Sequence, residues 1–484
     1  MTPRPSPVSR FVAAPLFFVF LLAATTFAAT PTEKVLHNFQ GTPDGADPTS
    51  RLVADSQGHL YGTTPNGGTG TNCGNYSGIP GCGTVFELTP PSASGGSWTE
   101  KVLYSFQGGN DGAVPVGGLI LDRDGNLYGT TSAGGDSTGA DCVSSSLPGC
   151  GTVFRLSPPQ ASSASWTESL LYVFQGGSDG NQPQSGLIFD GKGDLYGTTY
   201  LGGSGYCDGY GAGCGSVFEL ASPLKAGDPW TESILYSFNG LGGAYYDGAG
   251  PWGGVVFDSK GNLYGTTSAG GASRCYSSES DCGGIVFQLA RPTAKGLPWT
   301  ENIIYEFGSN AYGSYPMSTL VFDKNGNLYG TTEIGGSGGC TDESDFPEGC
   351  GTVFELSPPA SGTAWNISIL YSFTGQNDGA IPLSGVVFDE KGSLYGTAVT
   401  GGGQGDCFWK GVPELGCGTA FRITPPATAG GVWDETTLHA FAGGSDGANP
   451  FGGVIYKSGN LFGTTTGYSS TLAASPGTVF AIRP

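Results

Sequence analysis

The sequence is poor in the residue types on which most catalytic and nucleic-acid-binding sites depend. Its 484 residues include three histidines, two methionines and only 19 lysines and arginines, against 40 aspartates and glutamates, so the net charge is −21. So acidic a chain repels nucleic acid and anionic lipid. We therefore expect no nucleic-acid partner, and we look for ligands among neutral molecules such as glycans, among cations, or among proteins.

Familiar catalytic motifs are also missing. The sequence has no Gly-x-Ser-x-Gly at a strand-to-helix turn, as a nucleophile elbow requires, no His-Glu-x-x-His motif and no glycine-rich phosphate loop after a strand. The histidines look like substitutes within a pattern, because His37 and His439 replace a tyrosine found elsewhere and His59 replaces an asparagine. The sequence therefore predicts no catalytic residue, no cofactor and no metal. Acid-pair glycosidase chemistry stays open, since it needs only two carboxylates at a suitable separation.

Long apolar runs are missing from the chain except at its start. Arg4 and Arg10 precede the run FVAAPLFFVFLLAATTFAA, and polar sequence begins at Thr30. A basic stretch, an apolar core and small residues at the end predict a secretory signal peptide at residues 1–29, with an uncleaved membrane anchor as the alternative. We expect a secreted protein, extracellular or periplasmic, with no stable membrane insertion after cleavage. Residues 30–484 are expected to form a single domain.

Glycine and aromatic residues are abundant. The chain has 88 glycines and 12% aromatic residues but only 12% charged residues. Disordered chains lack aromatics and apolar runs, whereas this chain has both. Short apolar runs separated by glycine-rich turns, with no helical periodicity after the N-terminus, indicate an all-β fold.

One phrase, Leu-Tyr-Gly-Thr-Thr or a close variant, recurs along the chain. Its seven copies lie 65 to 68 residues apart and begin at Leu60, Leu127, Leu195, Leu263, Leu328, Leu394 and Leu461. Each copy holds four strand candidates, which in the second copy are 117–122, 126–131, 151–157 and 166–174. The first of these is a continuous apolar run, typical of a strand buried on both faces.

Four short strands in each of seven repeats predict a seven-bladed β-propeller of four-stranded antiparallel blades. The last repeat ends after three strands, and residues 32–39 match the missing fourth strand. We therefore expect this N-terminal strand to close the last blade. Within each repeat, an aspartate such as Asp122 opens a tight turn, where its carboxylate can accept backbone N–H groups. A calcium loop needs a distant acid that these turns lack, so the turn interpretation is preferred.

The twelve cysteines fall into six couples, each inside the loop between the second and third strand of one repeat. Pairing within each loop explains why the seventh repeat lacks both partners, and it suits an exported protein. Zinc is the alternative, but the spacing within the couples is too wide for a usual zinc site. The predicted disulfides are Cys73–Cys82, Cys142–Cys150, Cys207–Cys214, Cys275–Cys282, Cys340–Cys350 and Cys407–Cys417.

The disulfide loops are expected to share one rim of the ring with the connections between blades. Those connections carry the motif Asp-Gly-Ala-x-Pro or a variant, including Asp44 in the first copy and Tyr312 in the aspartate position of the fifth repeat. Exposed aromatic residues beside carboxylates suit sugar binding. The alternative is that the aspartates cap turns and the aromatics cover their own loops. The candidate binding residues are Phe408, Trp409, Tyr206, Tyr210, Tyr312, Asp111, Asp179, Asp247, Asp378 and Asp446.

The run VLYSFQGGNDGAVPVGGLILDRDGNLYGTTSAGG, followed by GCGTVFRLSPP, closely resembles the GloVer tandem repeat of exported bacterial proteins. The resemblance extends over all seven copies, and it implies an exported, repeat-built protein with no activity that can be carried over. We expect a secreted, non-catalytic binding or surface-interaction module whose glycan or protein ligand lies on the disulfide-lobed rim. The alternatives are an extracellular carbohydrate-active enzyme, a glycosidase or lyase that uses rim carboxylates, and a structural component of the envelope or matrix.

Overall fold

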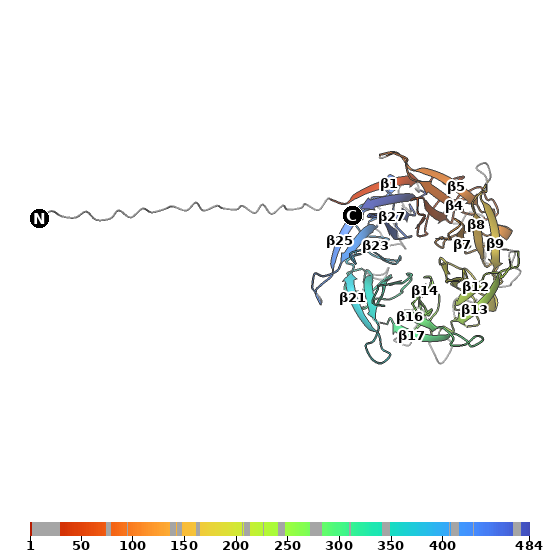
Figure 1. The fold of residues 1–484 in the computed structure, drawn as a ribbon. Helices are drawn as coiled ribbons and strands as arrows, with labels where there is room; N and C mark the ends of the chain where they lie inside the picture. The colour runs from red at the N-terminus through yellow and green to blue at the C-terminus, as the bar shows by residue number, and fades with distance from the viewer. Residues whose placement is uncertain are drawn as a thin grey trace. The chain divides into compact units, whose positions relative to one another are not determined.

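Residues Pro31–Pro484 form one compact unit in the computed structural model, a ring of seven four-stranded antiparallel sheets (Figure 1). Among the described residues, no helix has the length and apolar character needed to cross a membrane. The structure describes residues 1, 30–73, 79–93, 95–135, 142, 148–160, 165–205, 207, 213–225, 227–240, 247–271, 283–308, 311–340, 349–405, 407, 416–428, 430–467 and 476–484.

The two inner strands of each blade come first in its repeat. The innermost strands are β2 (Val53–Ala54), β6 (Ile120–Leu121), β10 (Ile188–Phe189), β14 (Val256–Phe257), β18 (Val321–Phe322), β22 (Val387–Phe388) and β26 (Val454–Lys457). The second strands are β3 (Leu60–Thr64), β7 (Leu127–Thr131), β11 (Leu195–Thr199), β15 (Leu263–Thr267), β19 (Leu328–Thr332), β23 (Leu394–Ala398) and β27 (Asn460–Thr465).

The two outer strands follow after the disulfide loop. The third strands are β4 (Thr84–Thr89), β8 (Thr152–Ser157), β12 (Ser216–Ala221), β16 (Ile285–Ala290), β20 (Thr352–Ser357), β24 (Thr419–Thr424) and β28 (Thr478–Arg483). The outermost strands are β5 (Thr99–Ser105), β9 (Thr167–Val173), β13 (Thr231–Ser237), β17 (Thr300–Glu306), β21 (Asn366–Ser372), β25 (Asp434–Ala440) and β1 (Thr32–Asn38). Short 3-10 turns lie between blades at η2 (Gly109–Asp111), η4 (Gly177–Asp179) and η6 (Gly444–Asp446).

The N-terminal strand closes the ring, as the sequence predicts. The last sheet has the order β1-β28-β27-β26, and β1 pairs antiparallel with β28 from Thr32 opposite Arg483 to Asn38 opposite Thr478. Figure 1 shows β1 beside β27 and the C-terminus. The two ends of the domain are therefore held together within one blade.

The innermost strand is shorter than the apolar run suggests. In the second blade β6 comprises only Ile120 and Leu121, both part buried, rather than the whole of 117–122. The prediction of burial on both faces was wrong because one side of this segment lies toward a cavity on the ring axis. The turn after it is as expected: the carboxylate of Asp122 accepts the backbone N–H groups of Asp124 at 2.9 Å and Asn126 at 2.8 Å.

The two threonines of the repeated phrase connect the layers of the ring. The hydroxyl of the first donates to a carbonyl in the next blade's axial segment, as Thr130 does to Ser185 at 2.9 Å. The second bonds to a hydroxyl on the third strand of its own blade, as between Thr131 and Thr152 at 2.8 Å. The same kind of hydrogen bond joins the last blade to the first, where the Thr464 hydroxyl donates to the Ser50 carbonyl at 3.2 Å.

The glycine of the repeated phrase makes room for a buried phenylalanine. A Cβ added to Gly129 would lie 2.7 Å from Cζ of Phe154 and 2.8 Å from Leu119. Phe154 in turn contacts Phe106 of the preceding blade, with ring centroids 5.1 Å apart. Equivalent Phe–Phe contacts join all seven pairs of adjacent blades.

Replacement of this glycine is expected to destabilise the ring. We expect Gly129→Ala to lower the free energy of unfolding by about 1–3 kcal/mol, because the added methyl group overpacks against Phe154. Chemical denaturation of the variant and the parent measures this. Gly191→Ala is the matched control, since a Cβ there meets no atom within 4 Å. Equal free energies of unfolding for the two variants would contradict the prediction, because they would show that the core accommodates the methyl group.

The segment that enters each blade begins with a residue in the left-handed region. In the second blade this is Val114, with φ 58°. Its N–H donates to the carbonyl of Cys82 in the first blade, and its carbonyl accepts the N–H of Ser132 in the second. A β-branched residue in this region costs about 1–3 kcal/mol, so the bonds to both blades hold a strained link. The chain then runs to the ring axis.

Candidate functional site

A cavity of about 1290 Å³ lies on the axis of the ring. Its wall is formed by the last residues of the connections between blades and by the innermost strands, and every blade contributes. Concave sites of this kind, with many apolar residues and a few polar groups, are where ligands commonly bind. We therefore take this axial cavity as the candidate functional site.

The layer nearest the disulfide loops is mostly apolar. It consists of the residue that follows the proline of each blade connection, and the seven residues differ from copy to copy. Trp252 is part buried and packs edge-on against Tyr200, with ring centroids 5.1 Å apart. The members of this layer are Thr49, Val116, Gln184, Trp252, Met317, Leu383 and Phe451.

The next layer consists almost entirely of small residues. Five blades have glycine at this position and one has Thr319, whereas the first blade has Arg51. The neighbouring chain is close: a Cβ added to Gly186 would lie 2.8 Å from the Gly118 carbonyl oxygen. The small residues thus let the blades approach one another near the axis. Arg51 is the one charged side chain in this layer, and it lines the cavity.

Within the described part of the chain, Arg51 has no partner of opposite charge. Among the residues that the structure describes, its side chain makes no hydrogen bond and no ion pair. The side chain is exposed to the cavity, yet protein surrounds it, and this burial lowers the pKa of its guanidinium. A guanidinium that lines a cavity without a carboxylate partner favours the binding of an anion.

Two acidic residues also line the cavity, at the end near the disulfide loops. Asp47 accepts a hydrogen bond from the Asn66 side chain at 2.9 Å, and burial raises the pKa of Asp47 to about 6. Glu333 is 6% exposed. Asp47 therefore changes its protonation state near neutral pH, which is a property of general acids.

The predicted aspartates lie elsewhere, at the contacts between outer parts of neighbouring blades. Asp111 accepts hydrogen bonds from the Tyr104 hydroxyl at 2.9 Å and from the Gln107 N–H at 2.8 Å. Asp247 is 3% exposed and accepts the hydroxyl of Tyr236 at 2.5 Å. None of the predicted aspartates lines the axial cavity. The same bonds are made by the pairs Tyr172–Asp179 and Tyr371–Asp378, and His replaces Tyr in the pairs His37–Asp44 and His439–Asp446.

A β-bulge places the partners of each aspartate. The outermost strand β5 pairs with β4, and the register of this pair shifts between Val85 and Phe86 of β4. Glu100 and Tyr104, which are four residues apart, would share a face in a regular strand, but the shift turns them to opposite faces. Six of the seven outer strands thus give a glutamate to the contact with one neighbouring blade and a tyrosine or histidine to the contact with the other, whereas β21 has Ile367 in place of the glutamate.

The glutamates at these contacts between blades have raised pKa values. Burial, together with the nearby Asp111, raises the pKa of Glu168 to about 7. The repeat that departs from this pattern supports a paired role, because Tyr312 replaces the aspartate and Ile367 replaces the glutamate of the next blade. Tyr312 is 46% exposed. The other pairs are Asp44–Glu100, Asp179–Glu232, Asp247–Glu301, Asp378–Glu435 and Asp446–Glu33.

Five of the six predicted disulfides are confirmed. They join Cys73–Cys82, Cys142–Cys150, Cys207–Cys214, Cys340–Cys350 and Cys407–Cys417. Cys275 and Cys282 lie outside the described residues, and so do the candidate binding residues Tyr206, Tyr210, Phe408 and Trp409. Disulfides are typical of oxidising compartments, which is consistent with the expected export. Export itself and a ligand on the rim stay predictions.

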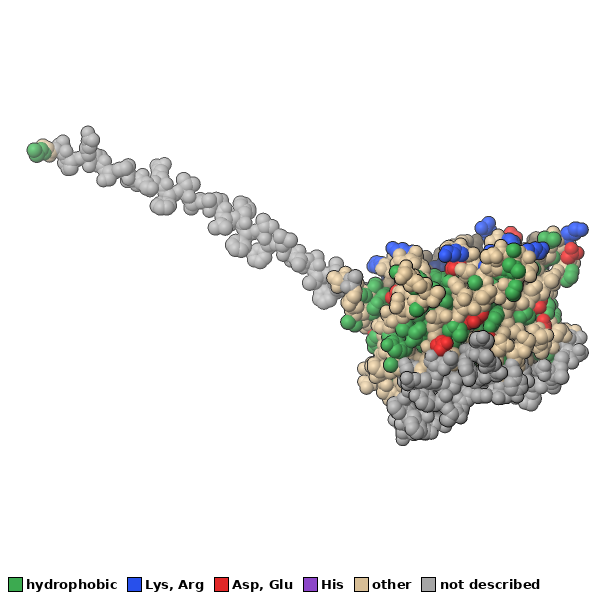
Figure 2. Space-filling view, turned by 90° about the horizontal axis from the view of Figure 1, so that it is seen from below, with side chains coloured by type: hydrophobic (Ala, Val, Ile, Leu, Met, Phe, Trp, Pro, Cys, Tyr) green, Lys and Arg blue, Asp and Glu red, His purple; other side chains and the backbone are tan. Residues whose placement is uncertain are grey.

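Basic side chains are unevenly placed. Figure 2 shows the Lys and Arg side chains that are in view gathered along one edge of the ring. Five first-hairpin turns carry an exposed cation at or next to the tip, namely Arg123, Lys192, Lys260, Lys324 and Lys391. The first blade has Gln57 in this turn, and its Arg51 lines the cavity.

An alignment of the seven copies shows that Arg51 departs from the repeat pattern. The copies read TSRLVAD in the first repeat and VGGLILD in the second, so arginine stands where glycine is the rule. The axial position of that residue could not be read from the copies alone. The varied residues after the proline carry the same signal, since a position that differs among otherwise similar copies is free of a common packing role.

The fold and the axial cavity define the class of protein, a seven-bladed β-propeller. The chain belongs to the Gloeobacter/Verrucomicrobia repeat family, whose model matches residues 22–207, 71–342 and 142–409. These matches overlap and together cover well over half of the chain. The resemblance to the GloVer repeat is thereby confirmed.

Solved structures similar to this chain have low sequence identity. A fungal alcohol oxidase of the AA5 family in complex with copper is 13% identical, with a TM-score of 0.48 over 94% of this chain and 77% of the oxidase. Virginiamycin B lyase from Staphylococcus aureus is 11% identical, with a TM-score of 0.47 over 94% and 99% of the two chains. A PL25 ulvan lyase is 9% identical, with a TM-score of 0.46 over 92% and 95%. Similarity at this level says nothing about the activity of this chain.

A comparison with curated proteins gave no match.

Proposed function

We propose that this protein is a non-catalytic binding protein that holds an acidic group of its ligand against Arg51 in the axial cavity. The observation that carries the proposal is an unpaired guanidinium in a layer that is otherwise glycine and threonine. An arginine in this layer serves no repeated packing role, because five other blades do without any side chain there. A charge-assisted, bidentate bond to a carboxylate would satisfy the guanidinium.

The overall charge narrows the class of ligand. A chain of net charge −21 repels polyanions at long range, so a ligand with many acidic groups is disfavoured. A ligand with one acidic group and no other charge can bind Arg51 without being repelled strongly by the acidic protein. The first layer of the cavity supplies Trp252, Phe451 and Met317, which suit the faces of sugar rings. The ligand class that fits is a short oligosaccharide with a single carboxylate-bearing sugar.

Calorimetry with the purified protein tests this proposal. We expect an oligosaccharide with one uronic acid to bind at least about tenfold more tightly than the same oligosaccharide with its carboxyl group reduced. Arg51→Gly introduces the residue that most other copies have. It should weaken binding of the acidic oligosaccharide by about 10- to 100-fold, the loss expected for a hydrogen bond to a charged group, and leave the reduced one unaffected.

Thr319→Gly is the matched control, because Thr319 lies in the same layer and carries no charge. It should change the affinity less than about twofold, within the range of an uncharged contact. Equal affinities for the acidic and reduced oligosaccharides, or binding untouched by Arg51→Gly, would contradict the proposal.

A carbohydrate-active enzyme is the second candidate, and Asp47 is the observation that favours it. Its raised pKa and its place at the cavity wall, with Glu333 on the same wall, are compatible with acid catalysis. Product analysis after long incubation of the ligand with the protein distinguishes the two functions. Cleavage that is lost in Asp47→Asn while binding persists would establish the enzyme.

A further inference from the structure

Two of the contacts between blades have a histidine, His37 or His439, where the others have a tyrosine. Six contacts combine an aspartate of one blade with a glutamate of the next. In four of them a tyrosine hydroxyl completes the group, whereas His37 and His439 complete the other two. Imidazole binds transition metals and a tyrosine hydroxyl rarely does, so this exchange changes the chemistry of the contact.

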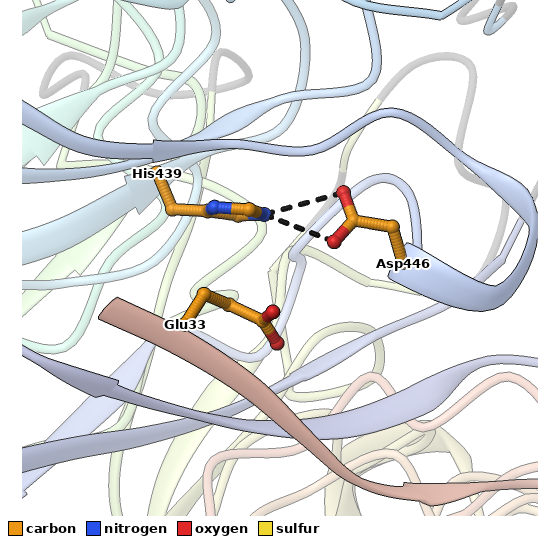
Figure 3. Close-up of side chains that lie close together, drawn as sticks. All are labelled: Glu33, His439 and Asp446. Carbon is orange, nitrogen blue, oxygen red and sulfur yellow. Dashed lines mark hydrogen bonds and ion pairs between the residues drawn. The ribbon is translucent and has the colours of Figure 1, made fainter. Parts of the chain in front are cut away.

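Each histidine forms a compact set of three ligands with its two carboxylates. One ligand atom each from Glu33, His439 and Asp446 lies within 4.8 Å of the other two, and the same holds for His37, Asp44 and Glu100. Figure 3 shows the His439 ring directed toward the Asp446 carboxylate, with Glu33 approaching from the strand β1. The distances from Nε2 of His439 to the two Asp446 oxygens are 3.1 and 3.2 Å.

Buried oxygens in both sets have no hydrogen-bond partner. They are Oε1 of Glu33 in the first set, and Oδ1 of Asp44 and Oε1 of Glu100 in the second. A buried carboxylate oxygen without a partner is costly, and either a proton or a cation relieves that cost. Glutamate oxygens of three tyrosine contacts, in Glu168, Glu232 and Glu301, also lack a partner among the described residues, but those contacts offer a cation no nitrogen ligand. The histidine contacts offer a cation two oxygens and one nitrogen.

The position of the two sets gives them a shared role. The strand β1 supplies Glu33 to the contact with the sixth blade and His37 to the contact with the first blade. The closing strand thus has one of these sets on each side, one toward each neighbouring blade. At the described contacts between the other blades, tyrosine stands at the position of the histidine. Histidine thus occurs at both contacts of the strand that closes the ring by non-covalent pairing.

We propose that Glu33, His439 and Asp446, and likewise His37, Asp44 and Glu100, bind one Zn²⁺ ion each and fasten the closing strand to both neighbouring blades. Zinc is commonly held by imidazole and carboxylate ligands about 2.1 Å away, which puts tetrahedral ligands about 3.4 Å apart. Small side-chain rotations bring atoms that already lie within 4.8 Å to this spacing. Water supplies the fourth ligand. Ca²⁺ is disfavoured because it takes six to eight oxygen ligands. This site was not expected from the sequence, which predicts no metal.

Equilibrium dialysis of the purified, chelator-treated protein against Zn²⁺ tests the stoichiometry. We expect two ions per chain with micromolar or tighter affinity, and a rise in the melting temperature of about 2–5 °C at saturating Zn²⁺ because only the folded ring binds. Ca²⁺ at the same concentration should give neither effect. Fewer than one bound Zn²⁺ per chain would overturn the proposal.

The repeats supply conservative variants. His37→Tyr and His439→Tyr restore the residue of the other contacts and keep a hydrogen-bond donor for the aspartate, so each variant should fold. Each should bind one Zn²⁺ ion and the double variant none, with the melting temperature in chelator unchanged. Glu33→Gln and Glu100→Gln should each also remove one ion, which tests the carboxylate ligands without touching the histidines.

His59→Asn is the matched control. His59 also contacts two acids, with Nδ1 2.9 Å from Asp55 and 3.5 Å from Glu87. It lies outside both ligand sets, and asparagine is the residue of several other copies, so this variant should retain two ions. Two ions bound by the double tyrosine variant, or loss of an ion in His59→Asn, would overturn the assignment.

Discussion

The melting temperature of the metal-free protein is expected to fall as the pH is raised from 5 to 8. Four glutamates carry this prediction, those whose contacts are completed by tyrosine rather than histidine. Burial and the aspartate of the neighbouring blade raise the pKa to about 7 for three of them and to about 8 for Glu301. The other three are Glu168, Glu232 and Glu435.

The direction follows from proton linkage. The ordinary pKa of these groups is 4.5, so between pH 4.5 and about 7 the folded chain holds protons that the unfolded chain has released. Stability is greatest where both states are protonated and declines as the pH passes through the folded pKa. Because the side chains are only part buried, solvent screening reduces the effect. We expect a decrease in the melting temperature of about 5–10 °C across this range.

Thermal melts in chelator at several pH values measure this decrease. Glu301→Gln replaces the most strongly shifted carboxyl group by a neutral group of the same shape. It should reduce the pH-dependent decrease by about a fifth, since Glu33, Glu100 and Asp47 also have raised pKa values in the metal-free protein, and it should raise the melting temperature at pH 8. Asp228→Asn, on the exposed link between β12 and β13, should leave the decrease unchanged. A melting temperature that rises with pH would show that the glutamates ionise without cost.

Removal of the closing strand is expected to abolish the folded ring. Deletion of Thr32–Asn38 leaves β28 with an unpaired edge and removes both contacts of β1 with neighbouring blades. Exposed strand edges pair with other chains, so the product should be aggregated or should lack a cooperative melt. Size-exclusion chromatography and circular dichroism measure the two outcomes. A monomer with the parent's melting temperature would contradict the role of β1.

Two controls separate strand pairing from the loss of a single contact. A synthetic peptide of residues 30–40 supplied during refolding should restore the monomer, whereas a peptide of scrambled order should not. Phe39→Ala keeps β1 but removes one buried ring, whose centroid lies 5.1 Å from that of Phe86 and 4.8 Å from that of His37. It should cost about 3–5 kcal/mol, and Phe106→Ala, which removes the equivalent contact with Phe154, should cost the same.

The repeat determines the architecture, and its length and turn chemistry are local properties. The spacing of the seven phrases predicts seven blades, and the incomplete seventh repeat predicts the partner of the N-terminal strand. The turn at Asp122 is set by a carboxylate and two nearby N–H groups, so it can be recognised from five residues. The cysteine couples are recognisable for the same reason, because each closes a short loop.

The candidate site depends on contacts between repeats. The cavity wall is built mainly from connecting segments, and the residues that face the axis depend on how closely the blades approach there. Arg51 is thus visible in the sequence as an exception, but its place in the cavity is decided by the ring. The aspartates of the blade connections illustrate the converse, since their pattern is plain in the sequence but only the fold shows which tyrosine or histidine each one contacts.

By itself the sequence determined the all-β class, the number of blades, the closing strand and the disulfide couples, because each follows from turn chemistry, from the spacing of the repeats or from the strand that the seventh repeat lacks. Only the tertiary structure decided which side chains meet. The bulge in each outer strand sends its glutamate to one neighbour and its tyrosine or histidine to the other. Asp111 and Glu168 therefore meet across a blade boundary although 57 residues separate them in the sequence. The lone arginine reaches the axis because the seven blades close around it.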